Sequence, residues 1–164
     1  QITVGKGYFE IPQKIRIQAP AVFDNESHLL GSYLKNTAAV EYLKGSRIDA
    51  PNIIFEIDNT IIKEGYILAV LANKILIKAN SSSGAFYAVQ SLIQLLPPKL
   101  DQEPPTWLGA IKIPVHTIQD APAFPYRGMH LDVSRHFFPK EFINIFNGDC
   151  FCINIHIRLI NFKF

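Results

Sequence analysis

Residues 65–98 read GYILAVLANKILIKANSSSGAFYAVQSLIQLLPP, and they contain the two hydrophobic periods that decide the fold. Segments 65–71 and 74–79 read as two β-strands with side chains on alternating faces. Residues 72–73 form a tight turn between them, because Asn73 tolerates positive φ. Both strands are rich in apolar residues, so we expect this hairpin at the centre of a sheet.

After the hairpin, the period changes from two residues to about 3.6 residues. A serine-rich start at residues 81–84 opens a helix that continues to residue 96, and Pro97 and Pro98 stop it. Apolar residues recur along this segment at intervals of three and four, at Phe86, Val89, Leu92, Ile93 and Leu96. The pattern predicts a helix with one apolar stripe that packs on the sheet.

Upstream of the hairpin, the patterns predict three strands and a second helix. The predicted strands are residues 8–11, 14–19 and 52–57. The helix is predicted over residues 24–44, because apolar residues again recur at three and four and Lys44 followed by Gly45 is a good stop signal.

Downstream, residues 99–106 carry three charges and two prolines and are predicted to form a surface loop. Residues 110–115 are predicted to form an edge strand, since Pro114 cannot donate a hydrogen bond to a ladder. The predicted order is β-β-α-β-β-β-α-β, ending near residue 120. It indicates an α+β fold, a mixed β-sheet with two helices on one face.

Composition excludes several classes of function. The 164 residues include 16 basic and 14 acidic residues, so the formal charge of +2 predicts no nucleic-acid partner. No apolar run reaches about 18 residues, and the start lacks the pattern of a signal peptide, so we expect no membrane span. Cys150 and Cys152 are the only cysteines, and no two histidines stand at ligand spacing, so we expect no metal and no cofactor.

Two motifs add a specific resemblance. Residues 120–139, DAPAFPYRGMHLDVSRHFFP, resemble the start of the catalytic barrel of glycoside hydrolase family 20, the β-N-acetylhexosaminidases. Residues 64–66 (EGY) and 83–92 (SGAFYAVQSL) resemble the N-terminal accessory domain of that family, the chitobiase domain 2-like fold. The resemblance implies an accessory domain over residues 1–121, then the first strand and the start of the first helix of a (β/α)8 barrel over residues 122–143.

The same resemblance implies the chemistry of the parent enzyme. It implies hydrolysis of terminal GlcNAc or GalNAc residues by substrate-assisted, retaining catalysis, in which an adjacent Asp-Glu pair orients the 2-acetamido group and supplies the general acid. It also implies partners that are N-acetylhexosamine-terminated glycans, and a secreted, periplasmic or lysosomal location. No adjacent acidic pair follows Arg127, so no catalytic residue is assigned and this chain alone is predicted to be inactive.

Arg127 is the one residue assigned to substrate binding. The resemblance implies that its guanidinium donates hydrogen bonds to hydroxyls of the terminal sugar, although the pattern puts Arg127 at the start of the predicted strand 128–133. Barrel enzymes build their sites at the other end of the strand. Asp132 and Arg135 are interpreted as a structural ion pair, and His130 and His136 as packing or hydrogen-bonding residues.

Residues 144–164 depart from the family pattern. Their period of two and high β-propensity indicate a strand where a helix would continue, and such a segment can associate with itself through exposed strand edges. A lost reading frame near residue 144, or a gene fragment, is one hypothesis for this tail. The alternative function is a non-catalytic glycan- or protein-binding scaffold module, although Trp107 is the only tryptophan and no exposed aromatic platform is predicted.

Overall fold

The computed structural model describes residues 1–97, 111–124, 126–132, 137–142 and 156–160. The chain divides into two compact units, Gln1–Ala121 and Pro122–Phe164, and each is described by itself. The predicted loop at residues 99–106, Trp107, Cys150 and Cys152 lie outside the described residues.

The described residues of the first unit form seven strands, a short 3-10 helix and two α-helices. In chain order they are β1 (Ile2–Ile11), β2 (Lys14–Gln18), η1 (Ala21–Phe23), α1 (Asp24–Ala38), β3 (Glu41–Gly45), β4 (Ile53–Ile57), β5 (Tyr66–Val70), β6 (Ile75–Ala79), α2 (Ser82–Gln94) and β7 (Ile111–Asp120).

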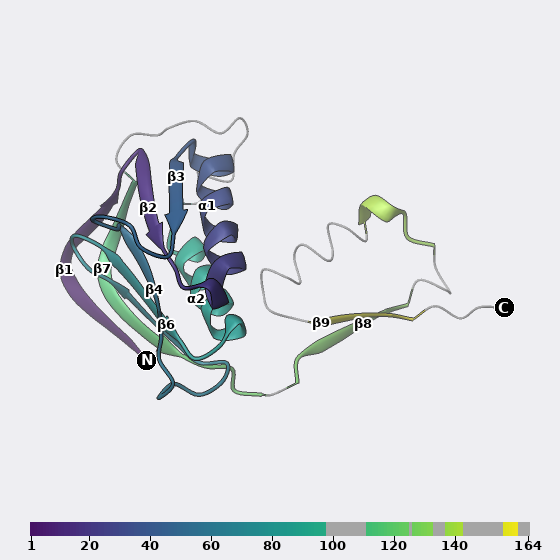
Figure 1. Ribbon diagram of the computed structural model, residues 1–164. Coiled ribbons are helices and arrows are strands. Elements are labelled where there is room, and N and C mark those ends of the chain that lie inside the picture. The colour runs from purple at the N-terminus through teal and green to yellow at the C-terminus, as the bar shows by residue number, and fades with distance from the viewer. Residues whose placement is uncertain (98–110, 125, 133–136, 143–155, 161–164) are drawn as a thin grey trace. The chain divides into compact units, whose positions relative to one another are not determined.

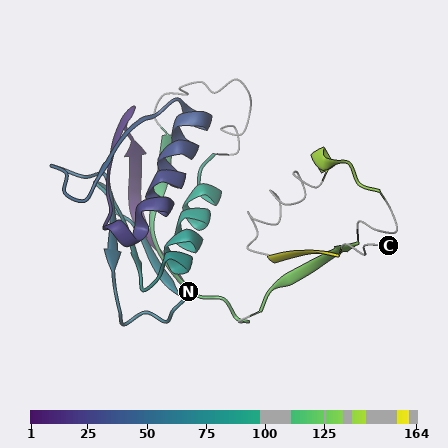
Figure 2. The ribbon, with the colours of Figure 1, turned by 45° about the vertical axis from the view of Figure 1, so that its right-hand side comes forward.

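The strands form one mixed sheet in the order β1-β7-β5-β6-β4-β2-β3. The half from β3 to β6 is parallel, and the half from β6 to β1 is antiparallel. Both helices lie against the same face of this sheet (Figures 1 and 2). The predicted α+β class, with a mixed sheet and two helices on one face, is therefore confirmed.

The predicted central hairpin is also confirmed. β5 and β6 pair antiparallel from Tyr66–Ala79 to Val70–Ile75 and stand third and fourth among the seven strands. Alternate side chains of both strands are buried beneath the helices. The helices complete one apolar core, whose largest fully buried side chains are Phe23, Ile15, Ile17, Leu30, Leu34, Ile53, Leu68, Ile75, Ile77, Leu92 and Ile113.

The predicted helix over residues 24–44 is too long. α1 ends at Ala38, and Ala39 takes a left-handed conformation with φ of 52°. Residues Glu41–Gly45 instead form β3, which pairs parallel and in register with β2. The sequence EYLKG fits either period, and the backbone hydrogen bonds gained from β2 decide for the strand.

The strand predicted at residues 110–115 is present, but its predicted position at the edge of the sheet is wrong. β7 runs from Ile111 to Asp120 and lies between β1 and β5. Pro114 is tolerated there because it stands opposite Tyr8, where the β1–β7 register shifts, while β5 pairs only with β7 residues from His116 onward. Gly7, at φ of 100°, supplies the positive φ that this irregularity requires in β1.

The second unit holds a two-stranded parallel sheet. β8 (Gly128–Asp132) pairs with β9 (His156–Ile160) over all five residues. Residues 140–142 are helical, and the rings of Phe138 and Phe142 stack with centroids 4.8 Å apart.

Candidate functional site

Arg127 directly precedes β8, so it stands at the start of a strand, as the sequence pattern indicates. Its Nη1 donates a hydrogen bond to the backbone carbonyl of Phe124, three residues upstream. Phe124 and Tyr126, in the same segment, are 70% and 72% exposed. Arg127 as a whole is half-buried, and its guanidinium is held by its own loop and carries five N–H donors in a fixed plane.

The other polar residues of the barrel-like motif are only partly described. His130 lies within β8, and Asp132 is its last residue. Residues 133–136, which include Arg135 and His136, lie outside the described residues. The interpretation of Asp132 and Arg135 as an ion pair therefore stays a prediction.

The described residues contain no group of three or more His, Cys, Asp or Glu side chains that could hold a metal ion. The three histidines His28, His116 and His156 belong to α1, β7 and β9 respectively. No helix among the described residues has the length and apolar character needed to cross a membrane.

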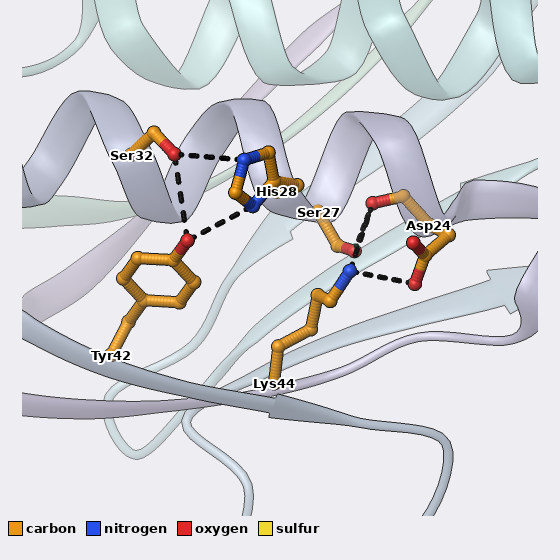
Figure 3. Close-up of polar contacts among 6 residues, drawn as sticks. All are labelled: Asp24, Ser27, His28, Ser32, Tyr42 and Lys44. Atoms are coloured by element: carbon orange, nitrogen blue, oxygen red, sulfur yellow. Dashed lines mark hydrogen bonds and ion pairs between the residues drawn. The ribbon is translucent and has the colours of Figure 1, made fainter.

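A polar cluster that the sequence did not predict joins α1 to the edge strand β3 (Figure 3). The Tyr42 hydroxyl lies 3.0 Å from His28 Nδ1 and 3.4 Å from Ser32 Oγ, and Ser32 Oγ lies 3.4 Å from His28 Nε2. At the other end, Lys44 Nζ donates to Asp24 Oδ1 at 2.7 Å. The sequence analysis missed this cluster because the helix predicted over residues 24–44 assigned Tyr42 and Lys44 to the wrong element.

The role of this cluster is structural and not catalytic. Serine, histidine and tyrosine are within hydrogen-bond reach, but the His28 ring is exposed and Ser32 lies in the middle of α1. A serine nucleophile needs an oriented base and donors for an oxyanion, and in the described residues the group against His28 Nδ1 is the neutral Tyr42 hydroxyl and not a carboxylate. We therefore interpret the cluster as a set of hydrogen bonds that holds β3 against α1.

A second buried contact joins the starts of the two helices. Glu26 is 7% exposed, and its Oε1 accepts a hydrogen bond from the Ser82 hydroxyl at the first residue of α2. Its Oε2 has no hydrogen-bond partner among the described residues. The carboxylate lies in the first turn of α1 and beside the first turn of α2, where helix dipoles favour negative charge.

Within the part of the chain that the structure describes, two ionisable groups have shifted pKa values. Burial raises the pKa of Tyr66. The Tyr66 hydroxyl lies 2.5 Å from Ser91 Oγ beneath α2, and this hydrogen bond opposes the shift. The negative charge of Asp120 adds to the increase in the pKa. Hydrogen bonds from the Thr60 hydroxyl and backbone N–H lower the pKa of Asp58. Both shifts arise from local packing and turn geometry.

Two open clefts are lined by described residues of the first unit. One, of about 430 Å³, lies at the carboxyl ends of β2 and β4, and its one carboxylate, Glu56, forms an ion pair with Lys78 at 3.4 Å. The other, of about 460 Å³, is lined by the 60–67 segment and the end of β7, and its one carboxylate is Asp120. Neither cleft brings together the two carboxyl groups that acid–base hydrolysis commonly uses.

The comparisons with known proteins agree with this arrangement. A family profile described as "Glycosyl hydrolase family 20, domain 2" matches residues 1–121. A β-hexosaminidase of Porphyromonas gingivalis is 42% identical over 79 residues, which are 48% of this chain and 10% of the relative. A β-hexosaminidase of Vibrio vulnificus is 31% identical over 143 residues, 87% of this chain and 15% of the relative. The chain thus spans a small part of the curated relatives that it matches.

Solved structures share the fold. A family 20 exo-β-N-acetylglucosaminidase of Vibrio harveyi, in complex with N-acetylglucosamine, superposes with a TM-score of 0.81 at 24% identity, over 97% of this chain and 24% of the other. A Streptomyces plicatus N-acetyl-β-hexosaminidase superposes with a TM-score of 0.82 at 23% identity, over 96% of this chain and 32% of the other. The family profile over residues 1–121 shows that the chain belongs to glycosyl hydrolase family 20 and that these residues are a domain 2 of that family.

Proposed function

We propose that this chain is the N-terminal part of a β-N-acetylhexosaminidase. Residues 1–121 are its accessory domain, and residues from 122 onward open its catalytic barrel with β8 as the first strand. The observation that carries the proposal is the order of the two parts: the match to domain 2 over residues 1–121 is followed by Arg127 and the strand β8. The names of the relatives, β-hexosaminidases in several bacteria, support the same activity for the parent enzyme.

The proposed reaction removes a terminal GlcNAc or GalNAc residue. The 2-acetamido group of the substrate attacks the anomeric carbon, an Asp orients that group, and a Glu donates a proton to the leaving oxygen. The acidic residues after Arg127 are Asp132, Glu141 and Asp149, and no two of them are adjacent. We therefore expect the chain by itself to lack hydrolytic activity, since general acid catalysis needs a positioned donor.

The role proposed for Arg127 is recognition of the sugar. A planar guanidinium can donate two parallel hydrogen bonds to neighbouring hydroxyls, which an ammonium group cannot reproduce. The hydrogen bond from Nη1 to the Phe124 carbonyl supports this role, because it fixes the side chain before a ligand arrives. The proposed residue thus recognises the substrate and takes no part in proton transfer.

A scaffold function without catalysis is less well supported. Glycan-binding domains commonly stack sugars on exposed aromatic rings, and Tyr8 is the only exposed aromatic side chain among the described residues of the first unit. Calorimetric titration of N-acetylglucosamine oligomers into the chain is expected to show no binding. Saturable binding that Tyr8→Ala abolishes would favour the scaffold function instead.

A chimera tests the proposed function. In it, the segment of the Vibrio vulnificus β-hexosaminidase that aligns with this chain is replaced by the corresponding residues of this chain, and hydrolysis of an aryl β-N-acetylglucosaminide is measured. We expect an active enzyme in which Arg127→Ala raises KM by about ten- to a hundredfold, the loss expected for charge-assisted hydrogen bonds of about 1.5–3 kcal/mol.

The matched control in the chimera is Lys140→Ala, at an exposed cation of the same unit. It is expected to leave KM unchanged. A chimera that folds and hydrolyses the substrate equally well before and after the Arg127→Ala change contradicts the role proposed for this residue. A chimera that folds without activity contradicts the assignment of the chain to this enzyme.

A further inference from the structure

The strand β1 lies at one end of the seven-stranded sheet, and among the described strands it pairs only with β7 (Figure 1). It has ten residues, whereas β3 at the other end of the sheet has five. The Gln119 N–H donates a hydrogen bond to the Gln1 carbonyl, so Gln1 faces β7. Successive residues of an antiparallel strand face opposite edges, so the N–H and carbonyl groups of Ile2 and Val4 point to the free edge of the sheet.

The exposed side chains of β1 are of the kinds that favour pairing with another strand. Ile2, Val4 and Tyr8 are 66%, 76% and 61% exposed. β-branched and aromatic residues stabilise cross-strand pairs. A long edge strand with apolar side chains and free backbone groups can add a strand from a second copy of the chain, unless the strand carries a feature that prevents it.

An irregularity in the middle of β1 interrupts this edge. The β1–β7 register shifts so that residues 5–7 stand opposite the single residue Val115. A Cβ on Gly5 would lie 2.6 Å from Val115 Cγ1, and Gly7 has φ of 100°, so both glycines are required where they stand. Extra residues on one strand bend it and break the regular spacing of its donors and acceptors. A second strand therefore could not continue its hydrogen-bond ladder past this point.

Lys6 lies at the centre of the irregularity and is exposed. It forms no ion pair with any described residue. An added strand would remove water from its ammonium group, which is costly for an unpaired charge. In the antiparallel register that pairs Val4 of one copy with Tyr8 of the other, the two Lys6 side chains would also face each other, and like charges directly opposite are destabilising.

We infer that the segment Gly5–Lys6–Gly7 keeps the edge strand β1 from pairing with a second copy of the chain. The two glycines permit the bulge that breaks the ladder, and Lys6 supplies the charge that a second strand would have to bury. This role concerns the association state of the accessory domain in solution and is independent of hydrolysis.

Sedimentation velocity of the full 164-residue chain tests the inference. Lys6→Val replaces the charge with a β-branched side chain, and deletion of Lys6 and Gly7 leaves one residue opposite Val115. The matched control is Lys112→Val, at an exposed position of the interior strand β7. The control loses the same charge and gains the same apolar side chain, but it lies on a strand without a free edge.

We expect both altered chains to self-associate, with a weight-average mass at least about twice that of the Lys112→Val chain at equal concentration, because one antiparallel strand pair makes a dimer. Adding Val4→Lys to the Lys6→Val chain should restore the lower mass, since it returns a charge to the same edge. Lys6→Val changes only an exposed side chain, so it decides the result if the deletion prevents folding. Equal masses for Lys6→Val and Lys112→Val would overturn the inference.

Amide hydrogen exchange locates the association. In the unmutated chain the Val4 amide, which faces the free edge, should exchange fast, and the Thr3 amide, which faces β7, should exchange slowly. In the associated Lys6→Val chain the Val4 amide should become protected. Protection of Val4 in the unmutated chain would show that β1 is already paired and would contradict the inference, as would association of Lys6→Val that leaves Val4 unprotected.

Discussion

Gly84 shows how a single position sets the distance between α2 and the β5 region. A Cβ placed on Gly84 would overlap the carbonyl oxygen of Gly65, which is backbone and cannot rotate away. This contact explains why the sequence carries glycine in the first turn of a helix, where alanine has the higher intrinsic propensity. The EGY and SGAFYA segments that carry the family resemblance thus meet at this contact.

Gly84→Ala tests whether the contact outweighs helix propensity. Propensity alone would stabilise the protein by about 1 kcal/mol, whereas overpacking against a fixed backbone atom costs typically 1–3 kcal/mol. We expect a net loss in the free energy of unfolding, measured by urea denaturation. Ser83→Ala, at the exposed neighbouring position, is the control and should change it by less than about 0.5 kcal/mol. A stabilised Gly84→Ala variant would show that the two segments do not approach closely.

Tyr66 gives a prediction for alkaline pH. Its pKa is raised in the folded state by burial, so the neutral phenol is favoured there. A raised pKa contributes stability that is present below the unfolded value of about 10 and is lost as pH rises through the folded value. The free energy of unfolding of the wild type should therefore fall relative to that of Tyr66→Phe between pH 8 and 11. A difference between the two proteins that stays constant with pH would contradict the burial of this phenol.

At the scale of elements, sequence patterns predicted those segments that have a single hydrophobic period. The hairpin β5–β6 alternates clearly, and α2 has a serine start and a proline stop, so both were predicted close to their observed bounds. β3 was missed because Glu41–Gly45 fits the helical stripe as well as a strand, and its state depends on pairing with the distant β2. β7 was misplaced for a similar reason, since an irregularity in β1 makes room for Pro114.

The Tyr42→Phe change tests whether the His28–Ser32–Tyr42 hydrogen bonds stabilise the packing of β3 on α1. The change removes the hydroxyl that lies near His28 and Ser32 but keeps the ring, which packs against Gly31. We expect a loss of about 0.5–1.5 kcal/mol, the usual net value of a hydrogen bond. Amide hydrogen exchange should speed up in Glu41–Gly45 and stay unchanged in the central strands β5 and β6.

The control for this change is Tyr8→Phe, which removes a hydroxyl from an exposed tyrosine on the opposite edge strand. It should leave exchange in β3 unaffected. If Tyr42→Phe and Tyr8→Phe behave alike, the His28–Ser32–Tyr42 cluster contributes nothing to the edge of the sheet.

At the scale of the whole molecule, the chain combines a domain that encloses its own core with a second unit whose described residues include two paired strands. The family could be recognised from two short motifs: one lies where Gly84 approaches the backbone of Gly65, and the other contains the strand proposed to open the barrel. The candidate site was less predictable: Arg127 could be named, but its hydrogen bond to the Phe124 carbonyl depends on loop geometry that no periodicity encodes. The pairing of β9 with β8 likewise depends on a long-range register.

The central claim is that this chain carries the accessory domain and the opening of a hexosaminidase barrel but no proton donor of its own. The most direct measurement is the hydrolysis of an aryl β-N-acetylglucosaminide by the purified 164-residue protein, with the Vibrio vulnificus β-hexosaminidase as a positive control. The account predicts release of the aryl alcohol at the rate of the uncatalysed reaction. Sustained turnover that Arg127→Ala abolishes would contradict it, because the chain would then hold a complete active site.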